Sequence, residues 1–247
     1  GKIFRPKWGA RMQSWVKMAL FVLAAAMLTR LVPFSEFFRN VYTLVHEMAH
    51  AVATLLLSGS VLYIHLYADQ SGVTHSLIQA GWRSILISLA GYTGAALFAW
   101  LLFRLQAGGR EKAGLMIVAA IAVLGLILFV RNGYGMLWCA GFAAVTLMIG
   151  LLAPGWLRVF YASLVAFICL VESVISSVTI FALSILDPAS AGDATNLGEA
   201  TPIPAAAWGG FFALFTLWCA KSATAILFRS MRRRRTGERR RPENFPL

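Results

Sequence analysis

Charged residues are scarce in this chain. Only 13% of its 247 residues are Asp, Glu, Lys or Arg, whereas a soluble domain carries about 25%. Hydrophobic residues make up 59%, and the mean hydropathy is +0.73. The apolar residues come in long runs rather than amphipathic stripes, which argues against an ordinary soluble domain and predicts an integral membrane protein. The runs also lack the polar–apolar alternation of a membrane β-barrel, so we expect spanning helices.

Cysteine is also rare, and its placement excludes two kinds of site. Cys139, Cys169 and Cys219 lie far apart in apolar runs, and no Cys-x-x-Cys pair exists. The sequence therefore predicts neither a thiolate zinc site nor a redox motif. The three cysteines are expected to be small residues of the core.

Seven apolar runs organise the chain, at about 18–29, 41–57, 82–103, 113–130, 136–153, 157–186 and 205–228. The first is short and follows basic residues, as in a signal peptide, but we interpret it as a retained anchor or interfacial helix. We predict an all-α polytopic membrane protein with a bundle of six or seven transmembrane helices. Its membrane domain covers residues 41–228, between a basic N-terminal segment with the anchor (1–40) and a basic tail (229–247).

A β-hairpin is predicted after the second run, in the stretch SVLYIHLYADQSGVTHSLIQ. Val61, Tyr63, His65 and Tyr67 alternate with apolar residues, and residues 69–72 have the composition of a turn. An open sheet edge does not face lipid, so the hairpin must lie at the interface or be shielded by protein. We expect its strand at 61–67 to offer an edge to an extended peptide.

Basic residues gather at the two ends of the chain, five in positions 1–17 and eight between Arg229 and Arg241. Beside apolar helices they indicate cytoplasmic charge facing anionic lipid rather than nucleic-acid binding. The C-terminus and the loop around 104–112 are then cytoplasmic, and the acidic loop at 187–199 lies on the other side. The same assignment conflicts with the basic N-terminus if residues 18–29 span the membrane. We expect an integral protein of the bacterial cytoplasmic membrane.

The second run contains an unusual group, His46-Glu47-Met48-Ala49-His50. Ionisable residues inside a membrane segment are costly and commonly mark a functional site. On a helix, residues four apart lie on one face, so His46 and His50 can bind one metal ion. Glu47 is then placed beside the metal without binding it. This His-Glu-x-x-His arrangement predicts a catalytic zinc site with Glu47 as general base.

These residues resemble the M50 family of intramembrane zinc metalloproteases, the site-2-protease type, and within it the M50B-like branch. The resemblance rests on residues 45–51, with support from Gly59-Ser60-Val61, Ser71–Thr74 and Ala90–Gly94. It implies zinc as the cofactor, a hairpin after the His-Glu-x-x-His helix, and an aspartate from a later segment as third ligand. The Leu-Asp-Gly motif that often carries this aspartate is absent.

Several acidic residues compete for the third-ligand position. Gly192-Asp193-Ala194 resembles the late Asp-Ala motif of the M50B-like branch, so Asp193 is the first choice. Asp187 precedes a proline and is more simply a helix-ending residue, while Glu199 fits a surface acid or a cap. Glu172 lies inside an apolar run, where it is either a ligand or the partner of a buried cation such as Arg30 or Lys221.

The resulting hypothesis is a zinc metalloendopeptidase that hydrolyses peptide bonds in or near transmembrane segments of a membrane-protein substrate. One alternative is a non-catalytic membrane scaffold that retains a structural metal site, for which His65 or His75 offers a fourth ligand. Another is a transporter, which would predict two related halves, and the sequence shows no convincing internal repeat. The sequence does not indicate the substrate, a regulator or the oligomeric state.

Overall fold

A computed structural model describes residues 7–31, 35–79 and 81–238. Most of them are helical, and the only sheet among them is a two-stranded antiparallel hairpin. In chain order the elements are α1 (Lys7–Leu31), α2 (Ser35–Leu56), β1 (Ser60–Leu66), β2 (Gly72–Leu77), α3 (Trp82–Ala107), α4 (Glu111–Leu124), the π-helical turn η1 (Gly125–Phe129), α5 (Gly133–Leu152), α6 (Gly155–Leu186), the 3-10 turn η2 (Pro188–Ser190), α7 (Asp193–Ala200) and α8 (Ala205–Glu238).

Five helical segments are long and apolar enough to cross a membrane. They are Trp82–Ala107, Glu111–Phe129, Gly133–Leu152, Gly155–Leu186 and Ala205–Arg232. The integral membrane class is thereby supported, but the predicted count of six or seven spans is not confirmed. Helix α2 is not one of the five, because its charged residues and two histidines lower its hydropathy.

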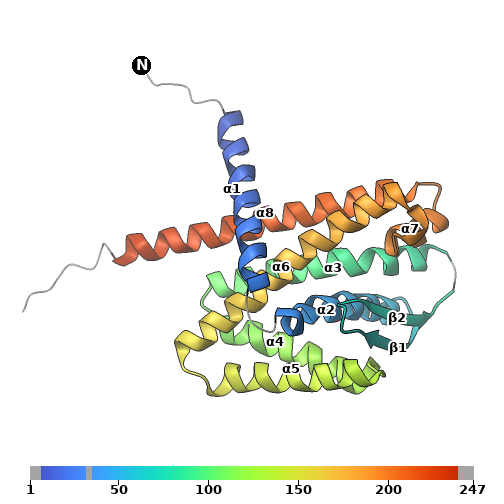
Figure 1. The fold of residues 1–247 in the computed structure, drawn as a ribbon, viewed down its shortest axis with the longest axis horizontal. Coiled ribbons are helices and arrows are strands. Elements are labelled where there is room, and N and C mark those ends of the chain that lie inside the picture. Colours follow the sequence, from blue (N-terminus) through green and yellow to red (C-terminus); the bar gives the residue numbers. More distant parts are fainter. Residues whose placement is uncertain (1–6, 32–34, 80, 239–247) are drawn as a thin grey trace, which may run out of the picture.

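The five spans run roughly along the long axis of the molecule, whereas α1 crosses them at a steep angle (Figure 1). Helix α1 contacts the bundle through Phe21, whose ring packs on Phe167 of α6 and Phe228 of α8. The run predicted at 18–29 is therefore part of a longer helix that does not follow the direction of the spans. The division into three segments at residues 40 and 228 stays a prediction.

One continuous core joins the helices. It includes Leu44 of α2, Phe103 of α3, Leu115 of α4, Phe142 of α5 and Ile168 of α6, all buried. Burying each such side chain contributes about 1.5–3 kcal/mol relative to exposure in water, although between helices in lipid the gain comes from close packing. The three cysteines are free and buried, as predicted.

The predicted hairpin forms in the predicted place. Strand β1 pairs with β2, with Ile64 opposite Thr74 and Leu66 opposite Gly72. Asp69 accepts hydrogen bonds from the amide and hydroxyl of Ser71 in the turn. Those donors lower the pKa of the Asp69 carboxyl.

The outer edge of β1 is occupied, which corrects one expectation from the sequence. Ile64 forms a parallel bridge with Val130. The side-chain amide of Asn132 both donates to the carbonyl of Leu66 and accepts from its N–H. The free edge of the described hairpin therefore belongs to β2, not to the strand at 61–67.

Candidate metal centre

Helix α2 places His46 and His50 one turn apart with their rings close together. The Nε2 atoms of the two imidazoles are 3.1 Å apart, and the ring planes meet at 79°. Nδ1 of His50 lies 2.8 Å from the carbonyl oxygen of Ile87 in α3. When Nδ1 donates its proton to that carbonyl, the lone pair of Nε2 is left pointing toward His46, as a metal ligand requires.

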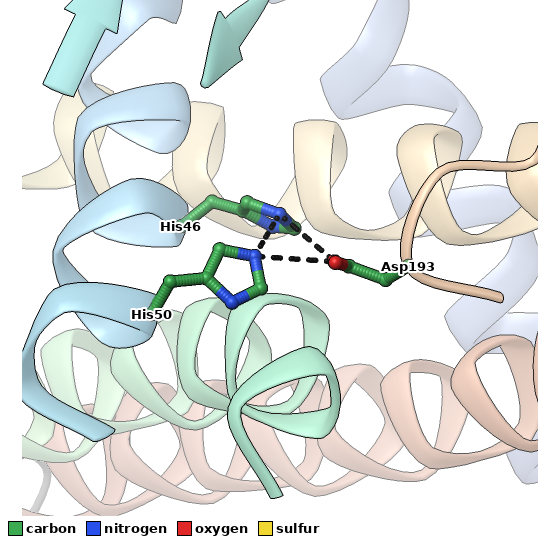
Figure 2. Close-up of side chains that lie close together, drawn as sticks. All are labelled: His46, His50 and Asp193. Carbon is green, nitrogen blue, oxygen red and sulfur yellow. Dashed lines mark hydrogen bonds and ion pairs between the residues drawn. The ribbon is translucent and has the colours of Figure 1, made fainter. Parts of the chain in front are cut away.

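Asp193 reaches the same point from the start of α7. Its Oδ2 atom lies 3.3 Å from Nε2 of His46 and 3.2 Å from Nε2 of His50 (Figure 2). Among the described residues, these three side chains form the one group of His, Cys, Asp or Glu residues with the spacing of a metal site. Burial would raise the pKa of Asp193, but the two imidazoles outweigh it and lower the pKa below its usual value.

The spacing of the three donor atoms fits zinc. A tetrahedral zinc ion with bonds of about 2.0–2.1 Å to nitrogen and oxygen has neighbouring ligand atoms about 3.3 Å apart. The three measured separations lie between 3.1 and 3.3 Å. Two imidazole nitrogens and one carboxylate oxygen are also the donor set of many catalytic zinc sites.

The competing acids lie elsewhere. Glu172 is bound by Arg39, whose Nε and Nη2 atoms lie 2.6 and 3.2 Å from its two carboxylate oxygens, and by Arg30 at 3.5 Å. Glu172 is therefore the partner of cations, which is one of the two roles considered from the sequence. Its main partner is Arg39, with Arg30 farther away. Asp187 accepts a hydrogen bond from Ser190. Neither acid, nor Glu199, belongs to the group around His46.

The hairpin histidines are also outside this group. His65 and His75 instead pack on the ring of Tyr63, with ring centroids 4.5 and 4.6 Å away. In this structure neither His65 nor His75 is a fourth ligand beside His46, His50 and Asp193.

Glu47 is buried beside the three donor residues and is held by the hairpin. The hydroxyl of Thr74 in β2 donates to Oε2 of Glu47 at 2.7 Å and lies 3.1 Å from the Glu47 carbonyl oxygen. Gly72, also in β2, brings the strand backbone close, because a Cβ atom there would lie 2.9 Å from Oε1 of Glu47. Strand β2 thus fixes the orientation of the Glu47 carboxylate.

Gly91 and Tyr92 of α3 complete the wall around the imidazoles. A Cβ atom at Gly91 would lie 2.6 Å from Nε2 of His46 and would also collide with His50. The Tyr92 ring packs edge-on against His46 with a centroid distance of 4.6 Å. Residues 90–94 support the family resemblance in the sequence, but the contacts of Gly91 and Tyr92 with the imidazoles arise only from the packing of α3 on α2.

A cavity of about 390 Å³ opens at the site. Its wall includes His46, Glu47, His50 and Asp193, with further polar side chains from the hairpin, α3 and α7: Thr74, Ser76, Ser88, Tyr92 and Asn196. This cavity offers polar groups and space for water inside an otherwise apolar molecule.

Fold and site together define a helical integral membrane protein with a His-Glu-x-x-His candidate metal centre. The chain belongs to the Peptidase M50B-like family, whose model matches residues 18–223. That match confirms the family resemblance seen in the sequence and indicates a peptidase. Comparisons with curated proteins and with solved structures gave no match.

Proposed function

We propose that the protein is a zinc metalloendopeptidase that cleaves membrane proteins in or near their transmembrane segments. One observation carries the proposal: two imidazole nitrogens and one carboxylate oxygen meet at zinc-ligand spacing, with Glu47 on the wall of the same cavity. Membership of a peptidase family and the five apolar helices support it. Three donors from the described chain leave a fourth position for water, as catalytic sites do and closed structural sites do not.

His46, His50 and Asp193 would hold the zinc ion. Bound zinc would lower the pKa of a coordinated water to about 7 and polarise the scissile carbonyl. Glu47 accepts a proton from the attacking water and donates it to the amine nitrogen as the C–N bond breaks. The hydroxyl of Thr74, which donates to Oε2 of Glu47, would hold the carboxylate in place for these proton transfers.

The substrate must present an extended backbone, because the peptide bonds of an intact helix are already hydrogen-bonded. We propose that an unwound substrate segment adds to the free edge of β2. Gly72, Val73, Thr74 and Ser76 of this strand line the cavity beside the donor residues. A peptide paired with β2 would therefore lie next to Glu47.

We further propose that the protein resides in the bacterial cytoplasmic membrane with its C-terminus in the cytoplasm. Support comes from the basic residues in the last turn of the final span and beyond it, starting at Arg229. Positively charged segments next to a spanning helix are retained on the cytoplasmic side.

The test compares the parent protein with Glu47→Gln, both purified in detergent, on a membrane substrate whose helix is destabilised near the cleavage site. We expect Glu47→Gln to keep its zinc and to lose cleavage by about 100-fold or more, the typical contribution of a positioned general base. Cleavage by Glu47→Gln at the parental rate, with equal zinc content, would show the mechanism to be wrong.

A further inference from the structure

The spanning helices have two distinct ends, and the candidate metal centre lies near one of them. The hairpin, the turn at 130–132 and α7 gather at this end, which we name the site end (Figure 1). The turns at 108–110 and 153–154 and the C-terminal part of α8 mark the opposite end, which we name the basic end. There, the side chain of Gln106 at the end of α3 donates to Ser163 of α6.

The site lies only a short way in from the site end. His50 contacts the carbonyl oxygen of Ile87, five residues after α3 begins at Trp82. At a rise of 1.5 Å per residue this is roughly 8 Å along the helix. Trp82 itself is exposed, and aromatic residues of this kind are enriched at membrane–water interfaces.

Basic residues are distributed unequally between the two ends. The basic end carries Arg104, Arg110, Lys112, Arg158, Arg229 and Arg232, and the sequence continues with further arginines after Arg232. The site end carries only Arg83 and Arg131 among its described residues, together with the acids Asp69, Asp187, Asp193 and Glu199. Since these connections are short, the excess of Lys and Arg sets the orientation of the helices.

Helix α1 is compatible with this orientation. Trp15 and Phe21 of α1 contact Lys221 and Phe228 in the C-terminal part of α8, toward the basic end. Because α1 crosses the spans at a steep angle (Figure 1), its N-terminal basic residues are not carried to the site end. The described part of α1, from Lys7 onward, therefore places no basic charge at the site end.

We infer that the candidate metal centre opens on the non-cytoplasmic side of the membrane. Its substrates would be membrane proteins whose scissile segment is presented at the level of the outer leaflet. The choice of substrate class rests on the proposed peptidase function, whereas the orientation does not. Water and the substrate backbone would both enter the cavity from the outer face.

The test is cysteine labelling of the full chain in intact bacterial cells with a membrane-impermeant maleimide. The native cysteines are first replaced by Ala, and single cysteines are placed at exposed positions. Ala68→Cys and Ala200→Cys report on the site end, and Ala113→Cys and Trp156→Cys on the basic end. We expect the first two to be labelled equally before and after permeabilisation, and the other two to be labelled only after it.

The reverse pattern, or labelling of both ends in intact cells, would overturn the inference. A second measurement does not depend on the cysteine variants folding. A fluorescent protein that matures only in the cytoplasm should fluoresce when fused to the C-terminus, and alkaline phosphatase fused there should be inactive. Because neither measurement needs activity, both can be repeated with Glu47→Gln, which separates a wrong orientation from a wrong function.

Discussion

Thr74 connects the hairpin to the candidate catalytic group more directly than any other described residue. Its hydroxyl donates to the carboxylate of Glu47, and its strand lines the cavity. The histidines and Glu47 could be assigned from four-residue spacing on one helix. Thr74 could not, because it lies in another element and Thr at that position is equally compatible with an ordinary strand.

The role of Thr74 predicts a selective effect of Thr74→Val. The variant keeps the shape of the side chain and removes one hydrogen bond to a charged group, a contribution of about 1.5–3 kcal/mol. We expect kcat to fall roughly 10- to 100-fold, with zinc content unchanged. Rates are measured on the helix-destabilised substrate and zinc by elemental analysis.

Thr224→Val is the matched control. Thr224 is buried in α8, and its hydroxyl bonds only to the carbonyl of Lys221 in its own helix. This variant should keep the parental kcat. A Thr74→Val protein with the parental rate would contradict the role of Thr74 in orienting Glu47.

At the scale of elements, α2 is fixed at both of its ends by polar contacts. Near its start, Arg39 binds Glu172 of α6 with two hydrogen bonds. Near its end, the hydroxyl of Thr54 lies within hydrogen-bond distance of Ser76 in β2. These contacts place the His-Glu-x-x-His turn between α6 and the hairpin. The apolar run alone predicted the helix but not its partners.

The Arg39–Glu172 pair predicts an unequal effect of single and double substitutions. Arg39→Leu removes the main partner of the buried Glu172 carboxylate and should destabilise the fold by about 3–5 kcal/mol. Arg39→Leu combined with Glu172→Leu removes both charges and should recover most of this loss, since an apolar pair can replace a buried ion pair. Unfolding in detergent measures both.

Two results would contradict this account of the pair. One is a single variant Arg39→Leu that is as stable as the parent. The other is a double variant whose loss of stability equals the sum of the losses in the two single variants. Such a sum would mean that the two residues do not interact, because the free-energy effects of substituting interacting residues do not add.

At the scale of the whole molecule, the candidate metal centre joins segments that are far apart in the chain. His46 and His50 come from α2 and Asp193 from α7, while α3 packs between them at Gly91. A bound ion would therefore hold α2 and α7 together across α3. Metal binding to the folded state alone must stabilise the entire bundle.

Zinc removal should lower the thermal stability of the purified protein. With free zinc at 100 times its Kd, the stabilisation is about 2.7 kcal/mol, so a chelator should reduce the unfolding midpoint and added zinc should restore it. His46→Ala is the control, because its midpoint should respond to neither treatment. An equal response of the parent and His46→Ala would show that the ion acts elsewhere.

The sequence by itself determined the membrane class, the helical architecture, the hairpin and the positions of His46, Glu47 and His50. Each depends on neighbours within one segment: the length of an apolar run, alternation in a strand, or one helical turn. The predicted count of six or seven spans is not confirmed, since five described helices are long and apolar enough to cross a membrane, and α2 is not among them because of its polar residues. The family model matches residues 18–223, so the resemblance seen around the His-Glu-x-x-His group covers most of the chain.

Only the tertiary structure decided which distant side chains meet. It separated Asp193, which lies beside the imidazoles, from Glu172, which lies beside Arg39, although both are carboxylates in a largely apolar chain. It also gave the free strand edge to β2, and made Gly91 a contact of two histidines. These outcomes depend on how helices and strands pack, and residues far apart in a sequence carry no local signal of the partner that packing will bring to them.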